Sequence, residues 1–266
     1  MKNKKIIYKN FIHNRYLNLN LNKKLNTVYS RIFKNVVKNL DISIDTFHTL
    51  SSKFQFNFSK KDIHQFKRFK NVVIIGMGGS TLGSQAIYGF LKKKIKKNFL
   101  FISNLRSDLN LKKDKRTQVN IIISKSGNTL ETICNSNTFL SDNQKNIIIS
   151  ELRDNYLNKL AADLKSDVIE HKNYVGGRYS VLSEAGMIPA ELMGLSTIKF
   201  KQFNYLIKNK IFVQNLLSNV QSIYLNVKKG RFLSFILNYD SSSEPFFKWY
   251  QQLVSESLGK KSKGVI

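Results

Sequence analysis

The sequence is poor in cysteine and proline and has no long apolar run. One cysteine among 266 residues excludes an internal disulfide framework and a zinc site built from cysteines. Two prolines and 13 glycines exclude collagen-like and proline-rich chains. No stretch approaches the roughly 18 apolar residues that a membrane-spanning helix needs. Hydrophobic residues still make up 42% of the chain, which is enough for a folded core.

Acidic residues are also scarce, 17 against 44 basic ones, and the net charge of +27 is typical of proteins that bind nucleic acid. Only 8 of the 44 basic residues are arginine, which specific recognition of phosphates and bases favours. A general bias towards Lys, Asn and Ile explains the charge, so nucleic-acid binding is not expected as the main function. We expect the run KKKIKK at 92–97 to be a solvated helix end. The N-terminus is basic but lacks the apolar block of a secretory signal, and we expect a cytoplasmic protein without a membrane partner.

Four short runs rich in β-branched residues show almost no polar alternation, as in parallel strands that are buried on both faces. They lie at residues 71–76, 99–103, 119–124 and 146–150. Helix-length segments separate them, at about 82–96, 129–139 and 152–164. This alternation predicts an α/β fold with a doubly wound parallel sheet.

The predicted division of the chain has four parts. A helical N-terminal segment (1–69) precedes the sheet-containing subdomain (70–196), a helical connector (197–228) and the start of a second subdomain (229–266). In the last part we expect a strand at RFLSFILNY (231–239) and a helix at EPFFKWYQQLVSESL (244–258).

The first motif, GMGGSTLGSQ (76–85), directly follows a predicted strand. Its glycines allow a tight turn and close approach by a ligand, and Ser80 lies where the next helix begins, a position that favours an anion. A dinucleotide fingerprint would require an acidic residue about 20 positions later, at the end of the second strand. Asp108 lies beyond that strand, which leaves an anion-binding turn or a purely structural tight turn.

The second motif, SKSGNTLET (124–132), again joins a strand to a helix. Its hydroxyl groups, one lysine and one glycine at a helix N-terminus suit a phosphate group, and the spacing of a Walker loop is absent. The alternative is an ordinary Ser/Thr helix cap. Two such loops on neighbouring parallel strands would converge at the carboxyl edge of the sheet, where these sheets bind ligands.

Two further motifs contain one charged residue each that could take part in catalysis. In VGGRYSVLSEAG (175–186), Arg178 follows two glycines and precedes a helix (about 180–194) that we expect Ser180 to cap. It could stabilise an oxyanion, or it could form a structural salt bridge. In WYQQLVSESLGKKSKG (249–264), Glu256 lies near the end of a predicted helix, where it could equally be solvated.

Together and in this order, the four motifs resemble the glucose-6-phosphate isomerase family, whose members contain two sugar-isomerase (SIS-type) subdomains. The resemblance covers roughly residues 70–266 and implies a first SIS-type subdomain, an incomplete second one and a helical N-terminal lead-in. It implies an aldose–ketose isomerase that interconverts glucose 6-phosphate and fructose 6-phosphate through an enediol(ate), in glycolysis and gluconeogenesis. It also implies a homodimer in the complete enzyme and a sugar phosphate as the small-molecule partner, with no cofactor and no metal.

The family's residue roles can be transferred onto matching positions of this sequence. Arg178 matches the arginine that stabilises the enediolate, and Glu256 matches the base that moves a proton between C2 and C1. The substrate-binding residues implied by the resemblance are Gly79, Ser80, Ser124, Lys125, Ser126 and Thr129.

One departure concerns residues that this family places after the ESLGK stretch, a ring-opening histidine and a late lysine. None of the four histidines here lies in a matching motif, and we interpret the sequence as a fragment of a longer enzyme that is inactive alone. Two alternatives remain open: a non-catalytic sugar-phosphate-binding module, or a related isomerase of another sugar phosphate.

Overall fold

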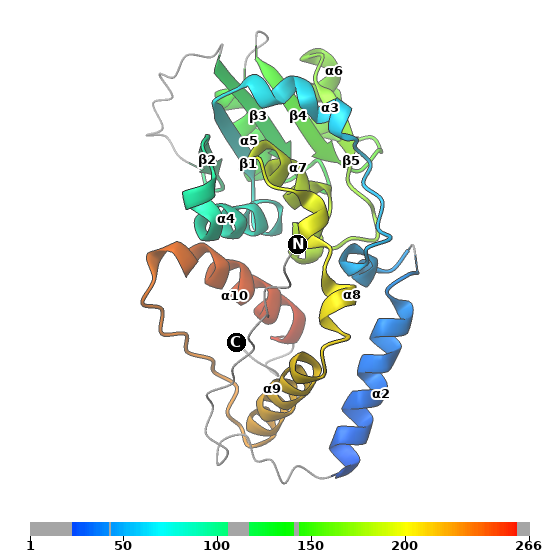
Figure 1. The fold of residues 1–266 in the computed structure, drawn as a ribbon. Coiled ribbons are helices and arrows are strands. Elements are labelled where there is room, and N and C mark those ends of the chain that lie inside the picture. Colours follow the sequence, from blue (N-terminus) through cyan, green and yellow to red (C-terminus); the bar gives the residue numbers. More distant parts are fainter. Residues whose placement is uncertain (1–22, 43, 106–116, 141–143, 260–266) are drawn as a thin grey trace. The chain divides into compact units, whose positions relative to one another are not determined.

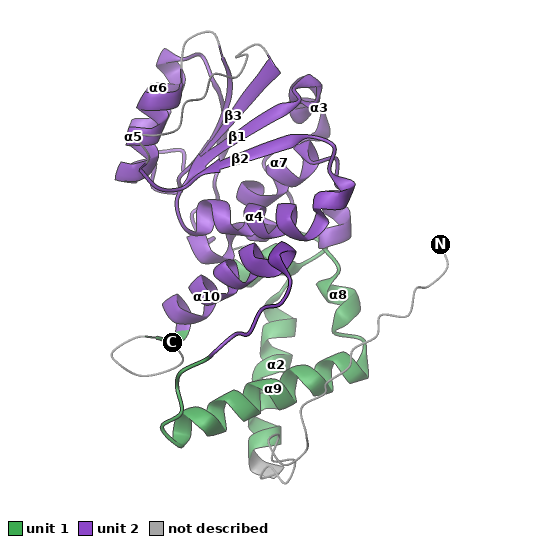
Figure 2. Cartoon of the chain, turned by 90° about the vertical axis from the view of Figure 1, so that its left-hand side faces the viewer, with its two compact units in different colours: residues 1–54, 201–234, 258–266 green, residues 55–200, 235–257 purple. Residues whose placement is uncertain are grey.

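The computed structural model describes residues 23–42, 44–105, 117–140 and 144–259. The chain divides into two compact units (Figure 2). The helical unit comprises residues 1–54, 201–234 and 258–266, and the sheet unit comprises residues 55–200 and 235–257. Segment 235–257, assigned from sequence to a second subdomain, therefore belongs to the same unit as the first sheet.

The sheet unit contains five parallel strands in the order β2-β1-β3-β4-β5 (Figure 1). Their bounds are β1 Asn71–Gly76, β2 Asn98–Ile102, β3 Gln118–Ile123, β4 Lys145–Ser150 and β5 Asp167–Glu170. The four strands expected from sequence are confirmed. The edge strand β5 was not expected from the sequence, because it has four residues and only Ile169 is buried.

Helices cover both faces of the sheet, because successive strand residues point to opposite sides. On one face, Ile74 and Ile121 pack against Phe66, which precedes the sheet in sequence, and against Ile188, which follows it. On the other face, Ile75 and Ile122 pack against Leu157. The first face is covered by α3 Lys60–His64, η2 Gln65–Arg68 and α7 Glu184–Leu192, and the second by α5 Leu130–Phe139 and α6 Tyr156–Asp163.

Helix α4 (Gly79–Leu91) packs against α7 and also contacts α10 (Glu244–Leu258). A Cβ atom on Gly89 of α4 would lie 3.1 Å from the Pro245 ring and 2.8 Å from the Ser242 carbonyl oxygen. Phe90 and Phe246 form an edge-on aromatic pair at 5.9 Å. The helix expected at 244–258 is therefore confirmed, and its start docks on α4.

The short connecting 3₁₀ helices complete the sheet unit. They are η3 Lys92–Lys94, η5 Gly177–Leu182, η6 Thr197–Phe200 and η7 Ser241–Ser243. The expected helix at 180–194 is in fact η5 followed by α7. Ser183 occupies the N-cap position of α7 without a side-chain capping hydrogen bond, whereas Ser180 lies inside η5.

The prediction of a strand at 231–239 is wrong. These residues have no regular secondary structure, and Phe235, Leu237 and Tyr239 are 86%, 79% and 93% exposed. A strand is stable only beside another strand, and no described strand pairs with this segment. No second sheet forms among the residues that the structure describes.

The helical unit contains α2 Lys23–Asn39, η1 Thr46–Leu50, α8 Phe203–Leu206 and α9 Lys210–Lys228. Helices α2 and α9 contact each other through an edge-on pair of Tyr29 and Tyr224 at 6.0 Å. The Gln221 amide also donates to Asn26 Oδ1 at 2.6 Å. Within the described residues, no helix combines the length and apolarity needed to cross a membrane.

Candidate functional site

The candidate site begins at the carboxyl edge of the sheet, where β1, β3 and β4 end in register. Gly76 pairs with Ile123, and Ile123 pairs with Ile149, so the loops that follow these residues start side by side. The chain runs from β1 outwards to β2 and then back to β3, which makes the β1–β3 boundary the point where the winding reverses. Sheets of this order bind ligands at that point. The expected convergence of the GMGGS and SKSGNT loops is therefore confirmed.

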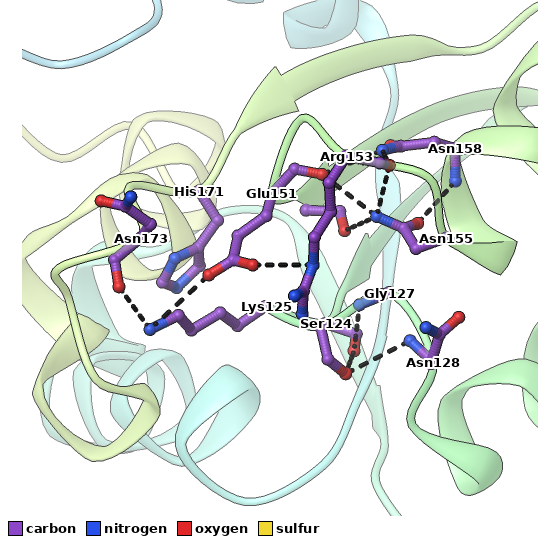
Figure 3. Close-up of polar contacts among 12 residues, drawn as sticks. Ser124, Lys125, Gly127, Asn128, Glu151, Arg153, Asn155, Asn158, His171 and Asn173 are labelled. Carbon is purple, nitrogen blue, oxygen red and sulfur yellow. Dashed lines mark hydrogen bonds and ion pairs between the residues drawn. The ribbon is translucent and has the colours of Figure 1, made fainter.

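The loop after β3 gathers three hydroxyl groups. Ser124 Oγ lies 2.8 Å from Thr129 Oγ1 and 3.5 Å from Ser126 Oγ. Ser124 Oγ also accepts from the Gly127 N–H at 3.2 Å, and Ser126 Oγ accepts from the Asn128 N–H at 3.2 Å (Figure 3). Thr129 is the N-cap of α5, yet its side chain makes no capping bond. The hydroxyls thus form a compact donor set at a helix N-terminus, as binding of a phosphate group requires.

Asn155 supports this loop from the β4–α6 connection. Its amide Nδ2 donates to Ser150 Oγ and to the carbonyls of Glu151 and Arg153 at 3.1–3.2 Å, while its Oδ1 caps α6 (Figure 3). Gly127 has φ +69°, and a Cβ there would lie 2.1 Å from Asn155 Oδ1. Only glycine therefore fits at this turn, because both the backbone conformation and the space exclude a side chain.

The ammonium group of Lys125 points away from the hydroxyls. It donates to the Asn173 carbonyl oxygen at 2.6 Å and lies 3.7 Å from Glu151 Oε1 (Figure 3). Glu151 also pairs with Arg153 at 2.9 Å, and its side chain is only 14% exposed. Lys125 thus ties the loop after β3 to the loops after β4 and β5 in this structure.

His171, which follows β5, is 2% exposed and close to this ion pair. Its Nδ1 lies 3.1 Å from the Lys172 carbonyl oxygen. Burial lowers the pKa of His171 below its usual value, and the positive charge of Lys125 lowers it further. The imidazole is therefore neutral near pH 7.

The loop after β1 touches the GGR loop through backbone atoms. A Cβ on Gly79 would lie 2.3 Å from the carbonyl oxygen of Gly177 and 2.7 Å from the Arg178 nitrogen. Ser180 Oγ donates to the carbonyl oxygens of Gly79 at 3.2 Å and Gly177 at 2.7 Å. Gly79 and the half-buried Ser80 thus begin α4 directly beside the backbone that carries Arg178.

Arg178 and Glu256, the two residues proposed from sequence for catalysis, face each other. Arg178 Nη1 lies 3.6 Å from Glu256 Oε2, with side chains 25% and 46% exposed. Ser257 Oγ accepts from Arg178 Nε at 2.9 Å and lies 3.0 Å from the Tyr179 hydroxyl, which orients the guanidinium. An exposed carboxylate beside a fixed cation can accept a proton while the cation stabilises an oxyanion.

Two further residues of this site, Gln252 and Ser257, were not expected from the sequence. Gln252 Nε2 donates to Glu256 Oε1 at 2.8 Å and lies 2.9 Å from the position of a Cβ on Gly78. Its Oε1 is buried and has no hydrogen-bond partner among the residues that the structure describes. The four-residue spacing between Gln252 and Glu256 on one helix was the signal available in the sequence. Among the described residues, no group of three His, Cys, Asp or Glu side chains could hold a metal ion.

A family model described as phosphoglucose isomerase matches residues 10–264. The chain belongs to the phosphoglucose isomerase family. Two curated members similar to it are glucose-6-phosphate isomerases. The one from Methanocaldococcus jannaschii is 33% identical, and the match covers 74% of this chain and 52% of that protein. The one from Acholeplasma laidlawii is 31% identical, and the match covers 76% of this chain and 53% of that protein. The chain spans about half the length of these curated relatives.

Among solved structures, a hypothetical protein from Thermus thermophilus shares the fold, with a TM-score of 0.73 and 18% identity. The similarity covers 92% of this chain and 63% of that one. Family membership and the parallel sheet together confirm the expected SIS-type α/β fold.

Proposed function

We propose that this chain supplies the phosphate-binding loop and the proton-transfer pair of an aldose–ketose isomerase that interconverts glucose 6-phosphate and fructose 6-phosphate. The observation that carries the proposal is the placement of Glu256 3.6 Å from Arg178. Membership of the phosphoglucose isomerase family supports the choice of substrate.

In this proposal Ser124, Ser126 and Thr129 exchange their mutual hydrogen bonds for bonds to the phosphate oxygens. The backbone of Gly79 and Ser80 lines the substrate, because it begins α4 beside the GGR loop. Lys125 adds positive charge near the loop while it stays tied to Asn173 and Glu151.

The Glu256 carboxylate removes the proton from C2 of the open-chain aldose and returns it to C1, while the proton of the C2 hydroxyl passes to the C1 oxygen. Removal leaves an enediolate whose negative charge Arg178, always protonated, stabilises electrostatically. The unpartnered Gln252 Oε1 can accept a hydrogen bond from a sugar hydroxyl and so orient the chain of carbon atoms. We further propose a cytoplasmic protein and a homodimeric complete enzyme, because the family resemblance implies both.

Calorimetric titration with glucose 6-phosphate tests the phosphate loop. Replacing Ser124 and Thr129 with alanine removes two hydroxyl donors, and we expect binding to weaken by about 1–3 kcal/mol. Thr138→Ala is the matched control, since its hydroxyl donates to the Cys134 carbonyl near the far end of α5. Equal affinities of all three proteins would contradict the proposal.

Solvent deuterium exchange at C2 tests the base. In a preparation that interconverts the two sugars, Glu256→Gln should slow exchange at least about a hundredfold while binding of the sugar phosphate is retained. Binding without any exchange in a protein that spans the full length of the relatives would instead favour a non-catalytic sugar-phosphate-binding module. Exchange on a different sugar phosphate alone would favour a related isomerase.

A further inference from the structure

A cavity of about 450 Å³ lies on the sheet unit away from the candidate active site. It is bordered by the end of α7, by the segment that leads into the amino end of β2, and by α3 and η2. The phosphate loop follows the carboxyl end of β3, so the two places are at opposite ends of the parallel strands. The charged residues of this cavity are Lys60, Lys67, Lys94, Lys96, Lys97 and Glu191.

The one acidic residue among the described residues that border this cavity is already engaged. Glu191 is 5% exposed, accepts from Thr197 Oγ1 at 3.2 Å and pairs with Lys67 at 3.4 Å. Its charge therefore offsets that of one lysine. The Lys97 ammonium donates to the Lys67 carbonyl oxygen at 2.8 Å, and this bond holds Lys97 close to Lys67.

A positive surplus remains after the local negative charges are counted. The carboxyl end of α7 adds the equivalent of about half a negative charge, and Glu191 adds one, against five lysines. Burial and the neighbouring charge of Lys67 lower the pKa of Lys97, as expected where cations are crowded. The run KKKIKK is a solvated helix end, as expected from sequence, because four of its five lysines are exposed and Lys97 is half-buried; Lys94, Lys96 and Lys97 also border this cavity.

We propose that this cavity binds a small oligophosphate, either inorganic or the phosphate chain of a nucleotide. A cavity of this volume is within the range of small-ligand sites. Lysines act as point charges on flexible stems, so several of them around a cavity select for the number of negative charges more than for one geometry. A ligand with several linked phosphates can contact ammonium groups on all sides, whereas a single phosphate reaches only a few. This inference does not depend on the proposed isomerase function.

The experiment is calorimetric titration of the full chain with inorganic tripolyphosphate at constant ionic strength. The test variant is Lys60→Gln with Lys94→Gln, and the matched control is Lys61→Gln with Lys93→Gln. Each control position adjoins its test position, is exposed and lies outside the cavity lining. We expect the test variant to bind at least about tenfold more weakly and the control to change less than about twofold. Orthophosphate should bind more weakly than tripolyphosphate to the unaltered protein.

Three results would overturn the proposal. Equal weakening in both double variants would assign binding to general surface charge. Weakening by Ser124→Ala with Thr129→Ala, but not by the test variant, would place the ligand at the phosphate loop. An RNA oligonucleotide that binds more tightly than tripolyphosphate and responds equally to both double variants would indicate an extended nucleic-acid surface. A matching titration with a nucleoside triphosphate distinguishes the two sources of the phosphate chain.

Discussion

Replacing Gly79 with alanine should disrupt the contact between the loop after β1 and the GGR loop. The added Cβ would lie 2.3 Å from one backbone oxygen and 2.4 Å from its carbon, both of Gly177. Ordinary contacts begin near 3.4 Å, so an overlap of about 1 Å must be relieved by moving backbone, which no rotamer change can do. Overpacking of this kind costs about 2–3 kcal/mol. The higher helix propensity of alanine stabilises the folded chain by at most about 1 kcal/mol, so the clash dominates and the substitution should lower the free energy of unfolding.

Gly177→Ala provides the control from the opposite side of the same contact. A Cβ at Gly177 meets no heavy atom within 4 Å, so this change should alter the free energy of unfolding by less than about 0.5 kcal/mol. Urea unfolding followed by circular dichroism measures both variants, and the melting temperature should fall by about 4–10 °C for Gly79→Ala alone. Binding of glucose 6-phosphate should weaken as well if the proposed function holds, because the displaced backbone lines the proposed substrate site and carries Arg178. Equal stabilities of the two variants would refute the packing argument.

Two further predictions concern the ion pair beside the phosphate loop. Burial lowers the pKa of His171, so below pH 6.5 the unfolded chain binds a proton at this residue more readily than the folded chain does. The free energy of unfolding should therefore be highest above pH 6.5 and should decrease as the pH falls below this value. The free energy of unfolding in urea should decrease between about pH 7.5 and pH 5.5, and His171→Gln should reduce this decrease by about 1 kcal/mol. His64→Gln, at an exposed position, should leave the decrease unchanged. Glu151→Gln should destabilise the chain by about 1 kcal/mol, because the Lys125 ammonium and the Arg153 guanidinium lose a largely buried partner. Asp154→Asn breaks only an exposed pair and should cost less than about 0.5 kcal/mol; equal losses would argue against a role for burial.

The sheet could be predicted from sequence because its central strands are buried on both faces. Runs such as NVVIIG and VNIII have no polar alternation, and the structure buries residues 72–76 and 119–123 almost completely. The absence of polar alternation was an unreliable criterion in two other places. It missed the exposed edge strand β5, and it predicted a strand at 231–239, where apolar residues lack a partner strand.

The hydroxyl cluster of the proposed phosphate loop could be predicted because its geometry is local. Six consecutive residues bring three hydroxyls together, and the register of β1 with β3 places the second loop beside them. The orientation of Lys125 could not be predicted, since it depends on Glu151 and Asn173 from two other loops. No spacing rule in the sequence links these positions.

The Arg178–Glu256 pair depends on packing between segments that are distant in sequence. It requires α10 to dock against α4, and that docking depends on glycines that leave room for Pro245 at Gly89 and for Gln252 at Gly78. The hydroxyl set of the phosphate loop needs neither contact. Changes on the α4–α10 surface should therefore impair proton transfer before they impair phosphate binding, because a displacement of about 1 Å at the base suffices to slow a reaction about a hundredfold. In the proposed function, binding and chemistry would thus depend on separable parts of the sheet unit, one held by local turns and the other by the approach of two helices.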